Sequence, residues 1–195
     1  NALAKVGQET QAEQLLRELL ATRTRLFGRE NNDTQITINS LAVVLHGMDR
    51  LDEAEALYRE AVDLGTRTLG AEHTDTMTAR MNLASLLRSR GKLTEAEPMM
   101  FAEYADVRKM YGDSHARTAS AAKVLADLYR QQGRFKDALP LLEECVAILR
   151  RAEGEQTESV AIAKRALAQT LKRLGERKRA TELQREVVAA YTRLH

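Results

Sequence analysis

Histidine and paired carboxylates are the first residues of this sequence to consider for metal or acid–base chemistry. His73 and His115 could ligate a metal, but a zinc site needs three or four ligands. The two histidines lie 42 residues apart, the period of a repeat described below, so we expect each to have a structural role in its own loop. Glu143 and Glu144 are adjacent and are expected on a helix surface in water. No metal site is predicted.

Nucleophilic chemistry has one candidate, Cys145, which is the only cysteine of the chain and therefore cannot form an internal disulfide. It occupies a small-residue position of the repeat that Ala61 also holds, and no histidine motif accompanies it, so we interpret it as a packed core thiol. The sequence contains no phosphate loop, no G-x-G-x-x-G and no Ser/His/Asp signature. These observations predict that the chain is not an enzyme and uses no cofactor.

Residues 172–179, with the sequence KRLGERKR, form the densest basic run of the chain. Such a cluster could contact phosphate, since nucleic-acid binding depends on lysine and arginine. The run has no interleaved aromatic residues for stacking on bases, and the net charge of the whole chain is only +2. We therefore favour solvated charges at a turn over nucleic-acid binding.

The composition predicts the elements that must position these residues. Ala, Leu, Glu and Arg dominate, all good helix formers, whereas aromatic residues make up 4% and Gly and Pro total 12. At 44% hydrophobic and 30% charged, each helix can bury one apolar stripe while the chain stays soluble. No stretch approaches the length of about 20 apolar residues that spans a bilayer, so we expect an all-α cytoplasmic protein without membrane contact.

Four classes of residue recur at intervals of 42 without insertion, and they define the repeats. The recurring positions are Gly28, Gly70, Gly112 and Gly154; Leu41-Ala42, Leu83-Ala84, Leu125-Ala126 and Leu167-Ala168; Ala54, Ala96, Ala138 and Ala180; and Gly91, Gly133 and Gly175, with Asp49 in the first copy. We predict one array over residues 1–195, part of a larger protein: a partial repeat 1–27 and full repeats 28–69, 70–111, 112–153 and 154–195.

Each repeat is predicted to hold two helices. In the second repeat, apolar residues at spacings of three and four indicate a helix over 75–89, and Gly91 supplies the left-handed residue that ends it. Asp49 takes the same conformation in the first repeat, at some cost. The next helix is expected to start at Thr94, whose spacing to Glu97 fits a capping box. One such hairpin cannot bury both of its apolar faces, so the hairpins must stack and leave a concave surface.

The repeats resemble the tetratricopeptide repeat. The resemblance rests on Leu83-Ala84, Gly91 and Glu95-Ala96-Glu97, and on the openings Leu69-Gly70-x-x-His73-x-x-Thr76 and Tyr111-Gly112-x-x-His115-x-x-Thr118, which are similar to the kinesin-light-chain-like subclass. Thr74 and Ala116 stand where that subclass usually has proline, and the Arg- and Ala-rich style resembles a bacterial array. The resemblance implies a right-handed α-solenoid of stacked antiparallel helix pairs that binds proteins.

The resemblance also implies which residues line the concave surface, because the first helix of each pair lines it in the family. Carried over position by position, the polar members of this set are Asn39, His46, Asn82, Arg88, Lys123, Asp127, Arg130, Arg165, Gln169 and Lys172. The first two repeats are nearly neutral here, whereas the last two carry an excess of basic residues against one acid. A wall of one sign attracts the opposite charge.

We therefore expect the concave groove to bind an acidic or C-terminal peptide. Asn82 would hydrogen-bond the peptide backbone, and Arg88, Lys123, Arg130 and Arg165 would pair with carboxylates, for which arginine offers two-pronged geometry. The alternative is that these are solvated charges on exposed helix faces.

Two other functions stay open at this point. The chain could be a regulatory or oligomerising arm of a larger signalling enzyme, self-associating through an exposed terminal helix with apolar Val187, Val188, Tyr191 and Leu194. It could also be a nucleic-acid-linked regulator acting through the basic C-terminal repeats. A scaffold for a partner protein is the interpretation that the sequence favours.

Overall fold

Left-handed backbone residues at the repeat period separate the helices of the computed structural model. Gly91 has a φ of +73° and follows the first helix of its repeat, as predicted. Asp49 has a φ of 62° and is the one non-glycine residue with positive φ among the described residues, which confirms that it replaces glycine at this position.

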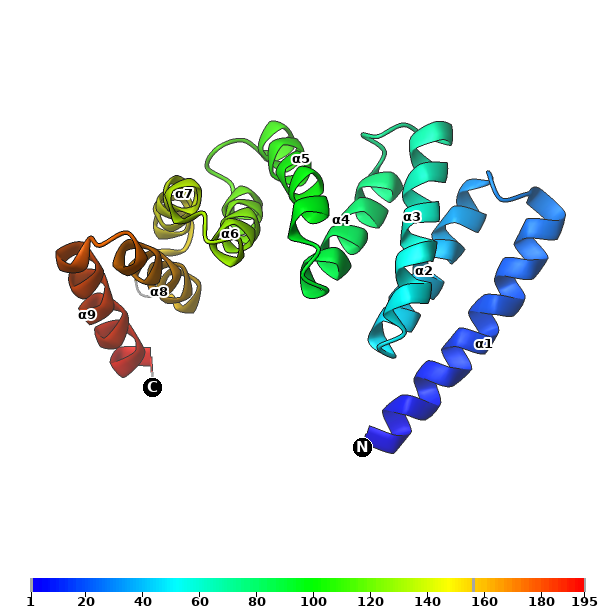
Figure 1. Cartoon of the computed structure of the whole chain (residues 1–195), viewed down its shortest axis with the longest axis horizontal. Coiled ribbons are helices and arrows are strands. Elements are labelled where there is room, and N and C mark those ends of the chain that lie inside the picture. Colours follow the sequence, from blue (N-terminus) through cyan, green and yellow to red (C-terminus); the bar gives the residue numbers. More distant parts are fainter. Residues whose placement is uncertain (1, 156, 195) are drawn as a thin grey trace. The chain divides into compact units, whose positions relative to one another are not determined.

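The structure describes the backbone of residues 2–155 and 157–194 and the side chains of residues 8–155 and 157–192. Within these residues every regular element is a helix, so the all-α fold class is confirmed. The helices are α1 (Ala2–Phe27), α2 (Asn32–Gly47), α3 (Leu51–Thr68), α4 (Thr74–Ser89), α5 (Leu93–Tyr111), α6 (Ala116–Gln131), α7 (Phe135–Glu153), α8 (Glu158–Arg173) and α9 (Arg177–Leu194) (Figure 1).

The loop histidines are N-caps, which confirms their structural role. The Nδ1 atom of His73 accepts a hydrogen bond from the Asp75 backbone N–H at 3.2 Å, and Nδ1 of His115 accepts one from Arg117 at 3.1 Å. Asn31 caps α2 from the same position of the first repeat. Each side chain satisfies a backbone donor that the first turn of a helix leaves without a partner.

The predicted capping box at Thr94 is wrong. The helix α5 begins at Leu93, so Thr94 is already inside it, and the Lys92 carbonyl accepts the first helical bond from Ala96. The Lys92 N–H also donates back to the Leu87 carbonyl of α4. The Lys92 N–H bond thus closes the end of α4 after Gly91.

The chain divides into two compact units, Asn1–Met99 and Met100–His195, with the boundary inside α5. In the N-terminal unit, α2 packs against α1 and α3, and α3 packs against α4; in the C-terminal unit, α6, α7, α8 and α9 pack in sequence order (Figure 1). The recurring alanines are buried in all four repeats, as expected for close helix packing: Ala54, Ala96, Ala138 and Ala180. One continuous array over residues 1–195 stays a prediction.

Within the described residues, no helix combines the length and the apolar character that crossing a membrane requires.

Candidate peptide-binding surface

Three predicted site residues form one ion-pair cluster on α6. Lys123 Nζ lies 2.8 Å from one carboxylate oxygen of Asp127, and Arg130 Nη1 lies 2.7 Å from the other. The residues are one helical turn apart, which places them on the same face. Two of the cations expected to bind a partner's carboxylates are therefore already paired with an acid of the chain itself.

The same arginine joins α6 to α8. Arg130 Nη2 donates a hydrogen bond to Gln169 Oε1 at 2.6 Å. Arg165 lies one turn before Gln169 and Lys172 one turn after it, so the exposed side of α8 continues the surface of the α6 cluster. The structure thus brings together the predicted site residues of the C-terminal unit.

Arg165 and Lys172 differ from the α6 cations in their pairing. Both side chains are exposed, and no described residue forms a hydrogen bond or an ion pair with either of them. Seven residues separate them along α8, or about 10 Å of helix. They leave positive charge on this face that the described residues do not neutralise.

In the N-terminal unit, Asn82 Nδ2 of α4 donates a hydrogen bond to Asn39 Oδ1 of α2 at 3.2 Å. His46 packs edge-on against Tyr58, with ring centroids 6.2 Å apart. Arg88 is half-buried, and its Nε is buried without a hydrogen-bond partner. The four predicted site residues of this unit thus lie on α2 and α4, where Asn39 and Asn82 are in direct contact.

The cations predicted at the end of the first helix of each repeat have a local cause. His46, Arg88, Arg130 and Lys172 lie in the last turns of α2, α4, α6 and α8. A cation there interacts favourably with the carbonyl end of the helix. Recurrence of basic residues at this position therefore does not by itself indicate a ligand. Whether a given cation is available to a ligand depends on whether another group of the chain already pairs with it.

A family model described as the tetratricopeptide repeat matches residues 33–100, 101–151 and 117–193, and a second one of the same description matches residues 1–33. The chain belongs to the tetratricopeptide repeat family. No curated protein matches the chain.

Solved structures of tetratricopeptide-type repeats share this fold. The nearly identical TPR-like repeats of a candidate kinesin light chain from Podosopora anserina have a TM-score of 0.86 at 24% identity, covering 98% of this chain and 90% of that one. BtubC (BKLC) from P. vanneervenii has a TM-score of 0.84 at 22% identity, covering 98% and 76%. MamA has a TM-score of 0.69 at 14% identity, covering 97% and 92%. The kinesin-light-chain-like resemblance is confirmed for the fold.

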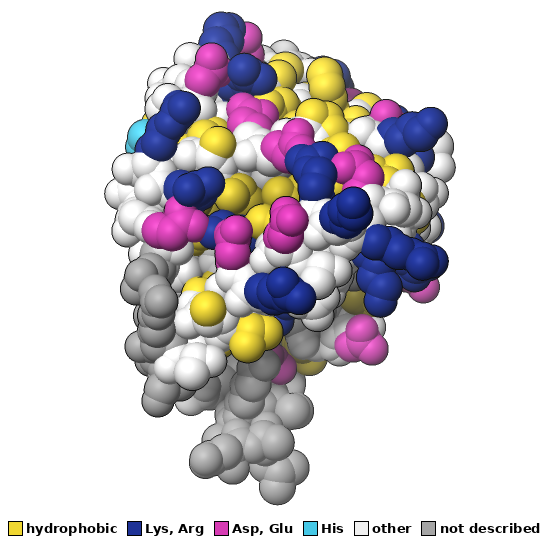
Figure 2. Space-filling view, turned by 90° about the vertical axis from the view of Figure 1, so that its left-hand side faces the viewer, with side chains coloured by type: hydrophobic (Ala, Val, Ile, Leu, Met, Phe, Trp, Pro, Cys, Tyr) yellow, Lys and Arg dark blue, Asp and Glu magenta, His cyan; other side chains and the backbone are white. Residues whose placement is uncertain are grey.

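The basic run at the α8–α9 turn of this tetratricopeptide repeat chain is partly engaged within the protein. Arg179 pairs with Glu143 and with Glu176, each at 2.7 Å, and Arg173 lies over the Phe135 ring at 5.8 Å from its centroid. Figure 2 shows basic and acidic side chains interleaved on this side of the molecule, with hydrophobic side chains exposed between them. The surface is mixed in charge, unlike a continuous phosphate-binding stripe.

Cys145 is fully buried, as predicted for a core thiol, and burial raises its pKa to about 11. A thiol with such a pKa is protonated at neutral pH and is a poor nucleophile. Among the described residues, no three His, Cys, Asp or Glu side chains are grouped so that they could hold a metal ion.

Sequence reasoning missed one feature of the N-terminal unit. A hollow of about 130 Å³ lies between α2, α3 and α4, and it is lined by Gln35, Ile36, Asn39, Ala61, Gly65, Asp75, Thr76, Thr78 and Ala79. Its one sequence signal is Gly65, a glycine inside a helix that does not recur at the repeat period.

Proposed function

We propose that this chain binds an acidic segment of a partner protein along the exposed face of α6 and α8. Repeats of this family typically serve as scaffolds for protein–protein interactions. The observation that carries the proposal is the presence of two exposed cations, Arg165 and Lys172, on one face of α8 with no partner among the described residues. Partner carboxylates would supply the missing negative charge.

The pairing of Asp127 shifts the expected contact from α6 toward α8. An acidic side chain approaching Lys123 or Arg130 would meet the Asp127 carboxylate, which already lies within 2.8 Å of both cations. An acidic side chain approaching Arg165 or Lys172 meets no such competitor on these residues. The Arg130–Gln169 hydrogen bond would then fix α6 against α8, and Arg165 and Lys172 of α8 would bind the carboxylates of the partner.

The N-terminal unit would contribute separately. After their mutual bond, Asn82 retains its carbonyl oxygen and Asn39 retains its amide N–H groups, which could hydrogen-bond an extended backbone. His46 and Arg88 stay proposed contacts of that unit.

Charge reversal on α8 tests the proposal. In titrations of fluorescent acidic peptides, Arg165→Glu with Lys172→Glu is expected to weaken binding by at least about tenfold, because it places like charges opposite each other. The affinity of the unaltered chain should fall with added salt. The matched control is Arg25→Glu with Lys136→Glu, which changes the net charge equally at exposed residues of α1 and α7. Equal weakening by both variants, or by neither, would refute the proposal.

Self-association is a second candidate, favoured by the outer side of α9. Val188 is 60% exposed there, in a shallow cleft lined by Thr181, Gln184, Arg185, Val188 and Ala189. Of the other residues predicted for this contact, Val187 is buried, Tyr191 is half-buried, and Leu194 lies outside the described side chains. An exposed apolar patch of this kind can mark an interface.

Light scattering across a range of protein concentrations tests this candidate. A mass that rises with concentration and returns to that of one chain in Val188→Asp would support it. Met110→Asp, which alters an equally exposed residue of α5, should leave the mass unchanged. A constant mass equal to that of one chain excludes self-association.

A further inference from the structure

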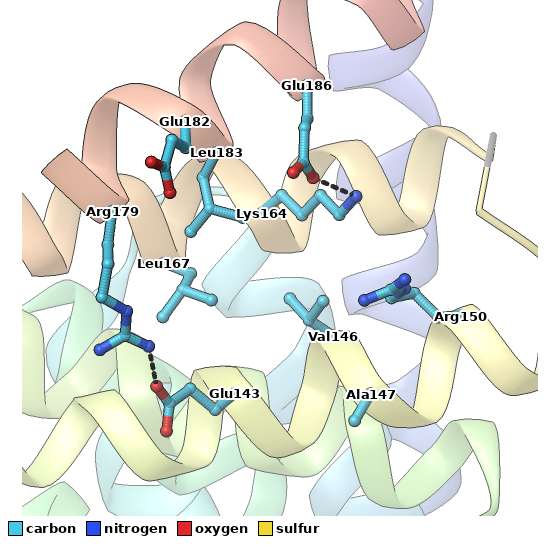
Figure 3. Close-up of a pocket in the computed structure, with 10 residues that line it drawn as sticks. All are labelled: Glu143, Val146, Ala147, Arg150, Lys164, Leu167, Arg179, Glu182, Leu183 and Glu186. Carbon is cyan, nitrogen blue, oxygen red and sulfur yellow. Dashed lines mark hydrogen bonds and ion pairs between the residues drawn. The ribbon is translucent and has the colours of Figure 1, made fainter.

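A second cleft lies in the C-terminal unit between α7, α8 and α9. Its volume is about 290 Å³, and Figure 3 shows the side chains that point into it from the three helices. They are Glu143, Val146, Ala147 and Arg150 of α7, Lys164 and Leu167 of α8, and Arg179, Glu182, Leu183 and Glu186 of α9.

The cleft has an apolar floor. Val146 and Leu167 are only 6% and 5% exposed, and Leu183 of α9 is half-buried beside them (Figure 3). Such a floor gains free energy when an apolar side chain displaces water from it. The cleft is large enough for one big side chain and not for a whole peptide.

Two ion pairs join the helices at the ends of the cleft. Arg179 Nη2 lies 2.7 Å from Glu143 Oε1, linking α9 to α7, and Lys164 Nζ lies 2.8 Å from Glu186 Oε2, linking α8 to α9 (Figure 3). Burial would lower the pKa of Lys164, but its bonds to Glu155 and Glu186 outweigh burial and raise the pKa above its ordinary value. The ammonium therefore stays charged at neutral pH and keeps its bonds to the two carboxylates.

One carboxylate at the cleft is left without a partner. Arg150 pairs with Glu155, and Arg179, Glu143, Lys164 and Glu186 are used in the two ion pairs. No described residue forms a hydrogen bond or an ion pair with the exposed carboxylate of Glu182. The three carboxylates and three cations of the lining balance in number, and Glu182 is the carboxylate among them that stays available beside the apolar floor.

We infer that this cleft is a docking site for a basic, hydrophobic segment of a partner protein. A leucine- or phenylalanine-sized side chain would enter between Val146, Leu167 and Leu183, and a neighbouring lysine or arginine would pair with Glu182. Large apolar anchors in preformed pockets, surrounded by polar contacts, are the usual source of binding energy at such sites.

This site is separate from the surface proposed for acidic segments. At 3.6 residues per turn, Lys164 and Leu167 project from the side of α8 roughly opposite to Arg165, Gln169 and Lys172. The unpaired charged groups of the two faces differ in sign: Glu182 at the cleft, and Arg165 and Lys172 on the other side of α8. A chain with both could hold two different segments at once.

Short synthetic peptides test the inference in fluorescence titrations with the whole chain. Each carries one phenylalanine flanked by two lysines, two glutamines or two glutamates. The lysine peptide should bind most tightly, and replacing its phenylalanine with alanine should abolish binding. Glu182→Gln should weaken the lysine peptide by about threefold to fivefold, the range of an exposed ion pair. The same substitution should leave the affinity for the glutamine peptide unchanged.

Two controls locate the effect. Glu30→Gln removes an exposed carboxylate of the N-terminal unit and should leave the binding of every peptide unchanged. In methyl NMR spectra, the lysine peptide should shift the signals of Val146, Leu167 and Leu183. No saturable binding, equal binding of the glutamate peptide, or an unchanged affinity in Glu182→Gln would overturn the inference. The variant Arg165→Glu with Lys172→Glu should bind the lysine peptide normally. The proposal for acidic segments and the proposal for this cleft can therefore be refuted independently of each other.

Discussion

Replacing Glu55 with glutamine is expected to lower the free energy of unfolding by about 2 kcal/mol, the scale for removing the charge of a buried, hydrogen-bonded group. Glu55 is 7% exposed, and its carboxylate lies 2.6 Å from Arg90 Nη1, 2.8 Å from Lys92 Nζ and 2.9 Å from Arg59 Nη2. These cations come from α3 and from the turn between α4 and α5. The carboxylate therefore ties the second helix of one repeat to the next repeat.

The loss is smaller than for a fully buried pair, because the cations can turn to water. Arg90, Lys92 and Arg59 keep 24%, 37% and 43% of their side-chain surface exposed. The matched control is Glu60→Gln, which breaks an exposed pair with Arg29 and should cost less than about 1 kcal/mol. Urea unfolding of both variants measures the difference. Equal losses would mean that burial of Glu55 does not matter.

The same carboxylate gives stability a definite dependence on pH. Burial would raise the pKa of Glu55, but the bonds from Lys92 and Arg59 outweigh it and hold the pKa below its ordinary value of 4.5. The folded state thus binds this proton less readily than the unfolded state. The contribution of the ionised Glu55 to the free energy of unfolding is complete above the unfolded-state pKa, and it disappears as the pH falls through the folded-state pKa. The difference between Glu55→Gln and the unaltered chain should therefore shrink below about pH 4.

The helices could be predicted because their signals recur. Gly91 and the buried Ala96 each have counterparts 42 residues away, and each has one physical cause: a left-handed turn or a close helix contact. A repeat multiplies such signals, so the hairpins followed from spacing alone. The start of α5 was misplaced by one residue, because a Thr-x-x-Glu spacing fits a capping box whether or not the threonine precedes the helix, and α5 begins at Leu93.

The candidate site could be predicted only as a set of positions. Its electrostatics depend on Asp127, which has no acidic counterpart at Val43, Ser85 or Gln169, so periodicity gives no sign that it neutralises Lys123 and Arg130. Periodicity finds what repeats, whereas an ion pair depends on side-chain contacts formed once. The cleft beside Glu182 was missed for the same reason.

Replacing Gly65 with alanine is expected to lower the free energy of unfolding by about 1–2 kcal/mol, although alanine is the better helix former by about 1 kcal/mol. A Cβ atom at Gly65 would lie 2.7 Å from Thr76 Oγ1 and 3.3 Å from Thr76 Cβ. Thr76 is 2% exposed and branched at Cβ, so it cannot move aside freely. Steric overlap between α3 and α4 should therefore outweigh the gain in helix propensity.

A double-mutant cycle separates the two effects. Thr76→Ala removes Oγ1, the atom in the most severe overlap, together with Cγ2, and it keeps Cβ. Because Thr76 Oγ1 has no hydrogen-bond partner, no bond is lost. With Thr76→Ala as background, Gly65→Ala should stabilise the protein, which gives a coupling of more than about 1 kcal/mol between the two sites. Gly47→Ala is the matched control, since its Cβ would meet only Glu9 Oε1 at an ordinary 3.7 Å. If Gly65→Ala stabilises the unaltered chain as Gly47→Ala does, α3 and α4 are not in the close contact that the structure places at this glycine.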